Sequence, residues 1–271
     1  MRILVLDVGG THVKALVLNG PGAPGADASS ADVGSNGDGG AAAASEPARI
    51  DSGPTLTPDQ MVAGIKQVGA DWQYDVISIG YPGPVVDGRP AVEPHNLAKG
   101  WVGYDFGRAF GREVRVINDA AMQALGGYQG GRMLFLGLGT GLGSALVIQG
   151  HLQPLELAHM PYKRGRTYEE YVGEAAREKA GNHKWRRTVV DVVNVLHTGM
   201  QSDSVLLGGG NARRLEKALD HMPPGTRLGS NADAMRGGVR LWAEARDRAG
   251  VTLDAGAEAA ASAVTAPDRA K

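Results

Sequence analysis

Apolar residues gather along this chain in short runs that stop at glycine turns. Residues 2–8 read RILVLDV, the turn Gly-Gly-Thr follows, and residues 13–19 read VKALVLN. Short apolar runs on both sides of a glycine turn predict two strands joined as a hairpin. The pattern returns about 130 residues later, where the apolar run 133–136 reaches a Gly-Thr-Gly turn and comes back through 144–148. The sequence therefore predicts one design that is used twice.

Strands and helices alternate through the rest of the patterned sequence, as in an α/β protein. Strands are predicted within 74–83, 112–118 and 203–210, and helices at 57–68, from about 120, at 185–200, at 212–222 and at 232–248. The helix at 57–68 has the clearest signals, with Thr57 as N-cap, Pro58 at the first helical position, and Met61, Ile65 and Val68 on one stripe. In the last helix, Gly237 and Gly238 each lower helix stability by about 1 kcal/mol.

Two stretches lack this pattern. Residues 20–47 are nearly all Gly, Ala, Ser, Asp and Pro, and residues 250–271 are rich in Ala without a sustained apolar face. A stretch of this kind does not bury enough apolar surface to offset the entropy lost on ordering it. We expect 20–47 to be a flexible surface insertion and 250–271 to be a disordered tail.

Composition excludes several classes of function. The 271 residues are 42% hydrophobic, which is ample for a buried core, and the net charge is -1, from 28 basic and 29 acidic residues. This balance gives no overall field that would hold nucleic acid or an anionic membrane, so a small molecule is the expected partner. Cysteine is absent, which excludes a disulfide framework, a thiolate nucleophile and Cys-ligated zinc. The N-terminus has neither a signal-peptide pattern nor a membrane span, and we expect a cytoplasmic protein.

The two glycine turns are candidate phosphate sites. Glycine reaches positive φ easily and allows a ligand to approach the backbone, while a threonine hydroxyl adds a donor. The turn residues are Gly9, Gly10 and Thr11 in the first half, and Gly139, Thr140 and Gly141 in the second. Asp7 is positioned to hold Mg²⁺ or its waters, and Lys14 to reach a phosphate. The alternative for each turn taken singly is a plain tight hairpin. Neither the P-loop spacing nor the dinucleotide fingerprint is present.

A further carboxylate follows a predicted strand. The apolar residues of 112–118 lead into Asn118 and Asp119, and a helix begins at about residue 120. A strand end places the Asp119 carboxylate at the lip of a cleft rather than in the core. The alternative is that Asp119 only caps the helix, although Asn118 could supply the cap instead.

The ordered set of motifs carries a family resemblance. LDVGGTHVK, INDAAMQAL, GLGTGLGSAL, LELAH and VLLGGGN, in this order over about residues 2–245, resemble the ROK family of sugar kinases in the actin-like ATPase and hexokinase superfamily. Within it, YPGPV followed by PHNLAKGW is most similar to the polyphosphate-dependent glucokinases. The resemblance implies two ribonuclease-H-like domains with a cleft between them. We place the first at 1–119 and the second at 120–249, with the helix 232–248 as a candidate to pack back on the first.

The resemblance also implies roles for single residues. Asp119 would be the general base for the sugar hydroxyl, and Asp7 the carboxylate on the Mg²⁺ side. The implied sugar ligands are Asn96, Asn118, Glu156, His159 and Glu169. Glu170 is an alternative to Glu169, and a packed histidine is the alternative for His159. Gly208, Gly209 and Gly210 would lie beneath a bound adenosine, or would only form a strand-to-helix turn.

The chain departs from the family pattern at two points. Ala158 stands where members usually carry the glycine of Glu-x-Gly-His, which adds a methyl group near the sugar. Many members also carry a Cys-rich zinc motif after that histidine, and this chain has no cysteine, so no zinc is expected. The same absence marks the polyphosphate glucokinase branch.

The expected function is phosphoryl transfer from polyphosphate, ATP or both to the 6-hydroxyl of glucose, with Mg²⁺, by a homodimer. The sequence does not choose the donor, although two basic runs, PYKRGR at 161–166 and HKWRR at 183–187, could bind polyphosphate. Another hexose is an alternative substrate. A sugar-sensing regulator is an alternative class, but we expect no DNA-reading head because the first strand starts at Arg2. A silent sugar-binding protein is disfavoured because Asp7 and Asp119 are both present.

Overall fold

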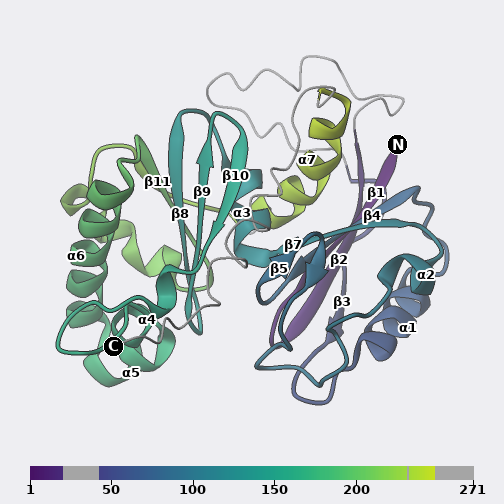
Figure 1. Ribbon diagram of the computed structural model, residues 1–271, viewed down its shortest axis with the longest axis horizontal. Helices are drawn as coiled ribbons and strands as arrows, with labels where there is room; N and C mark the ends of the chain where they lie inside the picture. Colours follow the sequence, from purple (N-terminus) through teal and green to yellow (C-terminus); the bar gives the residue numbers. More distant parts are fainter. Residues whose placement is uncertain (21–42, 231, 248–271) are drawn as a thin grey trace, which may run out of the picture.

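The structure is a computed structural model, and it describes residues 1–20, 43–230 and 232–247. Most of the expected insertion and all of the expected tail lie outside the described residues. Two five-stranded sheets lie side by side, with helices α3 (Asp119–Gly127) and α7 (Asp233–Asp247) between them (Figure 1). Among the described residues, no helix is both long and apolar enough to cross a membrane.

The first sheet contains the opening hairpin and three further strands. Its order is β3 (Ala48–Asp51), β2 (His12–Asn19), β1 (Arg2–Val8), β4 (Val76–Tyr81) and β7 (Glu113–Asn118). β1 and β2 are antiparallel, as the apolar pattern predicts, and so are β2 and β3. β4 and β7 continue the sheet in parallel with β1, so these three strands end at one edge of the sheet.

The second sheet repeats this arrangement. Its order is β10 (His151–Leu155), β9 (Leu142–Ile148), β8 (Arg132–Leu138), β11 (Ser204–Gly208) and β12 (Thr226–Leu228). The first three strands are again antiparallel and the last two again parallel. The details repeat as well, because the Asp75 Oδ2 accepts from the Arg2 amide at 2.7 Å, and the Asp203 Oδ2 accepts from the Arg132 amide at 2.7 Å. The prediction of one design used twice is confirmed.

The remaining elements complete the fold. They are α1 (Pro58–Val68), β5 (Val85–Val86), β6 (Arg89–Pro90), α2 (Phe106–Phe110), η2 (Leu157–His159), α4 (Glu169–Val172), α5 (Glu174–Ala180), α6 (Asn182–Met200) and η3 (Ala212–His221). Residues of α1 and α2 pack on the outer face of the first sheet, and residues of α4, α6 and η3 pack on that of the second. The helix predicted at 212–222 is a 3-10 helix, η3, and not an α-helix.

Helix α1 shows how the local signals act. Thr57 caps it and forms a capping box with Gln60, as Ser/Thr-x-x-Gln sequences do. Met61 and Ile65 are buried as predicted. Val68 is 42% exposed, whereas Pro58 and Val62 are buried, so the buried face of the helix includes positions 58 and 62 in place of 68.

Two glycines let α3 and α7 cross closely. A Cβ atom on Gly126 would overlap the backbone of Asp233, and one on Gly237 would overlap the backbone of Met122. Gly237 therefore makes the crossing possible as well as lowering helix propensity. Helix α7 also contacts the first sheet, where the Ser78 hydroxyl donates to the Gly238 carbonyl at 2.6 Å and accepts from the Trp242 indole at 2.8 Å.

Candidate functional site

The end of β1 carries an ion pair between two predicted site residues. Asp7 and Lys14 lie directly opposite each other in the antiparallel register of β1 and β2. The Lys14 Nζ is 3.3 Å from the Asp7 Oδ2, and the Asp7 side chain is only 13% exposed. Opposite charges at facing positions stabilise such a pair modestly. In the second hairpin the matching facing positions are Gly137 and Gly143, so the hairpin itself does not require a charged pair there.

The sequence suggested that the turn glycines adopt a positive φ, and the structure shows that they do not. Gly9, Gly10, Gly139 and Gly141 all have φ outside that region. Close approach explains two of them instead. A Cβ on Gly10 would lie 3.3 Å from the Asn96 Cβ, and a Cβ on Gly141 would overlap the Glu169 carboxylate. Gly139 has open space where a side chain would be.

Both turns leave backbone amides without partners. The Gly9 amide donates to the His12 carbonyl at 3.0 Å, and the Gly139 amide donates to the Gly141 carbonyl at 3.1 Å. In the part of the chain that the structure describes, no partner is found for the amides of Gly10 and Thr11 in the first turn or of Thr140 and Gly141 in the second. Groups of free amides in a turn are suited to binding an anion.

Asp119 is the first residue of α3, and Asn118 is its N-cap. The Asn118 Oδ1 accepts from the Ala121 amide at 3.0 Å, and its Nδ2 donates to the Gly83 carbonyl at 3.0 Å. Asn118 thus supplies the cap, which leaves the Asp119 carboxylate available, although its Oδ1 accepts from the Ala120 amide at 2.7 Å. The two capping contacts leave Asn118 one amide hydrogen and one lone pair for a ligand.

The Asp119 carboxylate has a strongly perturbed pKa. Burial, together with the negative charges of Asp7 and Glu156, raises its pKa from 3.8 to about 7, against the lowering effect of nearby backbone amides. The topology explains why Asp7 is close. Gly80 lies in register with Asp7 on one side and with Ile117 on the other. A Cβ on Gly80 would overlap the Met122 methyl group and lie 3.5 Å from the Asp119 Cα, so glycine here lets the start of α3 lie against the strand next to Asp7. Sequence reasoning missed Gly80, because its role depends on strand order.

Three of the predicted sugar ligands, Asn96, Glu156 and His159, lie on two separate segments. Asn96 is exposed beside the first turn, against Gly10. Glu156 and His159 are exposed at the start and end of the turn η2, and Glu156 lies near enough to Asp119 to affect its pKa. The Ser144 hydroxyl anchors this segment, since it donates to the Leu155 carbonyl at 2.9 Å and accepts from the Leu157 amide at 3.1 Å.

The neighbours Glu169 and Glu170 have different surroundings. The half-buried Glu169 accepts through Oε2 from the Leu142 amide at 3.1 Å, directly after the second glycine turn. Glu170 is exposed and turned toward the segment before its helix, where its Oε2 accepts from the Thr167 amide at 2.8 Å. That amide and the Arg166 guanidinium lower the Glu170 pKa. Only Glu169 contacts the turn.

A polar network that the sequence did not indicate supports the second turn. The Glu174 amide donates to the carbonyls of Gly139 and Thr140, and the Asn211 amide donates to the Leu138 carbonyl at 2.9 Å. The Asn211 Nδ2 also donates to Glu174 at 2.7 Å. Hydrogen bonds from Arg177 and Asn211 lower the pKa of Glu174 to about 2. These residues come from α5 and from the start of η3, so only the folded chain brings them together.

The glycines at 208–210 follow β11. A Cβ on Gly208 would press on the Phe135 ring. Gly209 has a φ of +81°, and its Cβ would overlap the backbone of Leu138. Gly210 faces open space. Two of the three are therefore needed for the strand-to-helix turn itself.

The described residues contain no group of three or more His, Asp or Glu side chains that could hold a metal ion. Mg²⁺ is commonly bound through one or two carboxylates together with substrate phosphates, so a ready-made cluster is not required. Asp7 fits this requirement, because its Oδ1 has no partner within the described residues and its Oδ2 contacts only Lys14.

Two five-stranded sheets of the same order, with helices between them, define the two-domain fold of the actin-like and hexokinase-type proteins, and the fold prediction is confirmed. The polyphosphate/ATP-glucomannokinase of Arthrobacter sp. strain KM matches with a TM-score of 0.70 and 22% identity, over 90% of this chain and 99% of that one. A ROK family glucokinase from Streptomyces griseus, in complex with glucose and AMPPNP, matches with a TM-score of 0.66 and 16% identity, over 89% and 99%.

Curated relatives agree with these structures. The polyphosphate glucokinase of Mycobacterium tuberculosis is 29% identical over 180 residues, covering 59% of this chain and 66% of the relative. The polyphosphate glucokinase of Mycobacterium leprae is 27% identical over 158 residues, covering 52% and 48%. The matched regions thus span less than two thirds of these relatives. No family model matches the chain. The predicted resemblance to ROK-family sugar kinases, close to the polyphosphate glucokinases, is confirmed.

Proposed function

We propose that this protein is a hexose kinase that transfers a phosphoryl group from ATP or inorganic polyphosphate to the 6-hydroxyl of glucose. The observation that best supports this proposal is the raised pKa of Asp119. A pKa of about 7 lies near the pH at which a general base works best. The names of the curated relatives and of the glucomannokinase support both the sugar and the donors.

In the proposed reaction, Asp119 accepts the proton of the sugar hydroxyl as that oxygen attacks the terminal phosphorus of the donor. A new bond forms between oxygen and phosphorus, the bond to the remaining phosphate chain breaks, and the donor leaves one phosphate shorter. Positioning and charge stabilisation provide most of the rate in phosphoryl transfer. The base therefore acts on a hydroxyl that other residues hold in line.

The sugar would be held by Asn96, Glu156, His159 and Glu169. Asn118 would add the one amide hydrogen and the one lone pair that its contacts within the protein leave free. Glu156 supports this assignment because it lies near enough to Asp119 to raise the Asp119 pKa. A sugar that contacts both residues would therefore join the start of η2 to the start of α3. Carboxylates and amides suit sugar hydroxyls because together they accept and donate hydrogen bonds.

The donor phosphates would lie against the free amides of the two turns, at Gly10, Thr11, Thr140 and Gly141, with Lys14 as a further cation. When bound, Mg²⁺ would neutralise charge on the donor phosphates, and Asp7 would hold it, directly or through water. Lys14 would then exchange its contact with Asp7 for one with phosphate. Gly208–Gly210 would face the adenosine when ATP is the donor.

The decisive experiment measures glucose 6-phosphate formation with ATP and, separately, with polyphosphate. We expect turnover with at least one donor. Asp119→Asn should lower kcat by about 10²- to 10⁴-fold, while glucose binding measured by calorimetry is largely retained. Asp71→Asn, which neutralises an exposed carboxylate elsewhere, is the matched control. Absence of turnover with any hexose and either donor would sink the kinase proposal, and full activity of Asp119→Asn would remove Asp119 as the base.

A further inference from the structure

A surface pocket of about 530 Å³ lies between helix α6 and the 3-10 helix η3, away from Asp119. Its polar lining is mainly basic, and consists of His183, Arg186, Arg187, Asp191, Lys217 and His221. Residues 183, 186, 187 and 190 recur at helical spacing, so they share one face of α6. The α6 side of the pocket carries His183, Arg186 and Arg187 beside Val190 and Asp191, and the η3 side carries Lys217 and His221.

The cations of this pocket are not neutralised by the protein. Within the described residues, Arg187 and Lys217 have no hydrogen-bond or ion-pair partner, and Arg186 donates only to the Arg214 carbonyl, at 2.6 Å. The single carboxylate, Asp191, is 3.7 Å from the Lys163 Nζ, which offsets its charge in part. The beginning of α6 also contributes a positive helix end. A site of this kind is suited to an anion with several charges.

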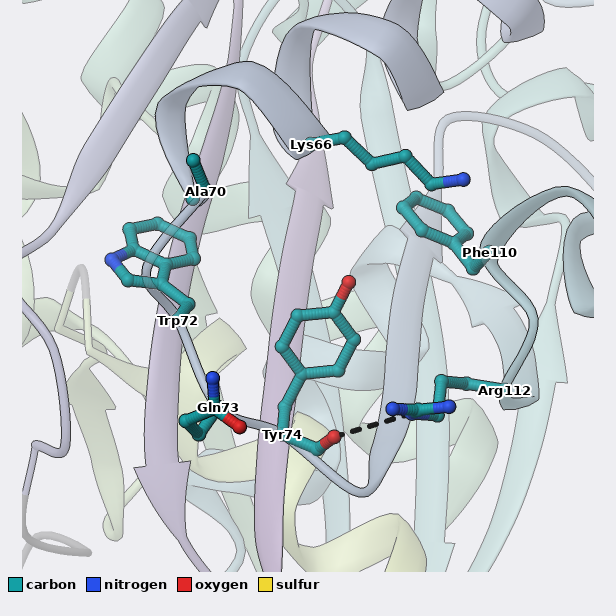
Figure 2. A pocket seen from close by; sticks show the side chains of 8 residues that line it. Lys66, Ala70, Trp72, Gln73, Tyr74, Phe110 and Arg112 are labelled. Atoms are coloured by element: carbon teal, nitrogen blue, oxygen red, sulfur yellow. Dashed lines mark hydrogen bonds between the residues drawn. The ribbon is translucent and has the colours of Figure 1, made fainter.

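The second pocket differs in this respect. It measures about 260 Å³ and lies between the end of α1 and the end of α2, where Figure 2 shows Trp72, Tyr74 and Phe110 together with two cations. There the Lys66 amine donates to the Ala109 carbonyl at 2.7 Å, and Arg112 donates to the Tyr74 carbonyl at 3.4 Å. Both cations already join neighbouring segments, so this pocket offers no comparable anion site.

Hydrogen bonds connect the basic pocket to the second glycine turn. Arg186 donates to the Arg214 carbonyl, and the Arg214 Nε donates to the Asn211 Oδ1 at 2.9 Å. The Asn211 amide in turn donates to the carbonyl of Leu138, the residue before the turn. A phosphate chain bound at the turn would therefore have further cations along the same side of the domain.

We propose that the pocket between α6 and η3, which we name the basic groove, binds the distal part of a linear polyphosphate donor whose reacting end lies at the glycine turns. The inference rests on the proposed function for the nature of the donor. ATP has only three phosphates, and its adenosine is proposed to lie at Gly208–Gly210, so only a long polyphosphate chain has further phosphates for the groove. Long chains should consequently bind more tightly than short ones.

The test is direct binding of long-chain polyphosphate and of tripolyphosphate, measured by calorimetry at several salt concentrations. Arg187→Gln with Lys217→Gln removes two exposed, unpaired cations and leaves Arg186 in its structural contact. We expect this double variant to lose about tenfold or more in affinity for the long chain, with a weaker salt dependence, and to bind tripolyphosphate as before. The matched control is Arg2→Gln with Arg108→Gln, which removes two exposed arginines from the first sheet and α2.

Several results would overturn the assignment. Equal affinity of the double variant and the unchanged protein for the long chain would do so, as would equal affinity of the unchanged protein for long and short chains. An RNA oligonucleotide that competes equally at matched charge would show a groove for polyanions in general. In kinetics, the double variant should raise KM for long polyphosphate and leave kcat and the KM for ATP unchanged. Long-chain binding without turnover would reject the kinase proposal alone, whereas turnover without chain-length dependence would reject the groove alone.

Discussion

The carboxylate of Asp7, at the end of β1, lies near enough to that of Asp119, at the start of α3, to raise its pKa. The two residues belong to different elements, and Gly80, on the strand between β1 and β7, lets α3 approach because a Cβ there would overlap the Met122 methyl group. In the proposed mechanism one carboxylate serves the donor and the other the sugar. Their charges are nevertheless coupled, and this coupling can be measured.

The first prediction concerns the pH dependence of turnover. Asp119 acts as a base only when deprotonated, so kcat/KM should fall about tenfold per pH unit below a pKa of about 7. Burial is the largest cause of the raised pKa, and the Asp7 charge is the next. Asp7→Asn should therefore move the acid limb of the profile to lower pH, whatever it does to the maximum rate. If the acid limb of the Asp7→Asn profile stays at the same pH as in the unchanged protein, the charge of Asp7 does not affect the pKa of Asp119.

The second prediction concerns stability. Because the Asp119 pKa is higher in the folded state than its ordinary value of 3.8, the folded state binds more protons than the unfolded state between about pH 4 and 7. Stability contributed by this group is thus present below pH 4 and is lost as the pH rises to 7. Asp119→Asn stays neutral and should exceed the unchanged protein in free energy of unfolding above pH 7, by about 1–4 kcal/mol.

Urea unfolding at pH 4, 6 and 8 measures this difference directly. It should grow from pH 4 to pH 8, and Asp71→Asn should show no such trend. A difference that is independent of pH would mean that the Asp119 pKa is not raised in the folded protein.

Much of the fold could be predicted because its signals are local. The repeated hairpin is evident from the apolar run 2–8, the turn of Gly9 and Gly10, and the matching segment 133–148. Thr57 likewise marks the start of α1. The short strands β3, β10 and β12 were not predicted, because three to five residues with mixed polarity give no clear periodicity. The backbone pairing that defines them comes from the neighbouring strands.

The site could be predicted only in part. Asp7, Asp119 and both turns stand out because polar or flexible residues follow apolar runs. The pairing of Asp7 with Lys14 depends on strand register, and the contact between Glu174 and Asn211 joins residues 37 positions apart. Such contacts leave no local pattern, and the same holds for the basic groove, whose two walls meet only in the folded chain.

The third prediction separates Glu169 from Glu170. Glu169→Ala removes the acceptor of the Leu142 amide beside the second turn, so KM for glucose or for the donor should rise about tenfold. Glu170→Ala removes an exposed hydrogen bond from the Thr167 amide, so it should cost about 1 kcal/mol of stability and leave both KM values unchanged. Initial-rate kinetics with each substrate varied in turn measure the effects. The reverse outcome would transfer the role to Glu170.

The fourth prediction concerns the crossing of α3 and α7, which holds the helix that presents Asp119. Gly237→Ala places a methyl group where the Met122 carbonyl lies, and rigid backbone on both sides prevents an easy adjustment. We expect a loss of about 2–4 kcal/mol in the free energy of unfolding, a size seen when strain enters a packed interior. Gly126→Ala should act similarly, because its Cβ would overlap the backbone of Asp233.

Gly199→Ala is the control for this prediction. Gly199 lies inside helix α6 with no atom within 4 Å of the added Cβ, so alanine should stabilise the protein by about 0.5–1 kcal/mol through helix propensity. Chemical unfolding of the three variants compares the two effects of a glycine in a helix. A stabilising Gly237→Ala would mean that the two helices do not approach closely in solution, and that Asp119 is held by its capping residue and the second sheet alone.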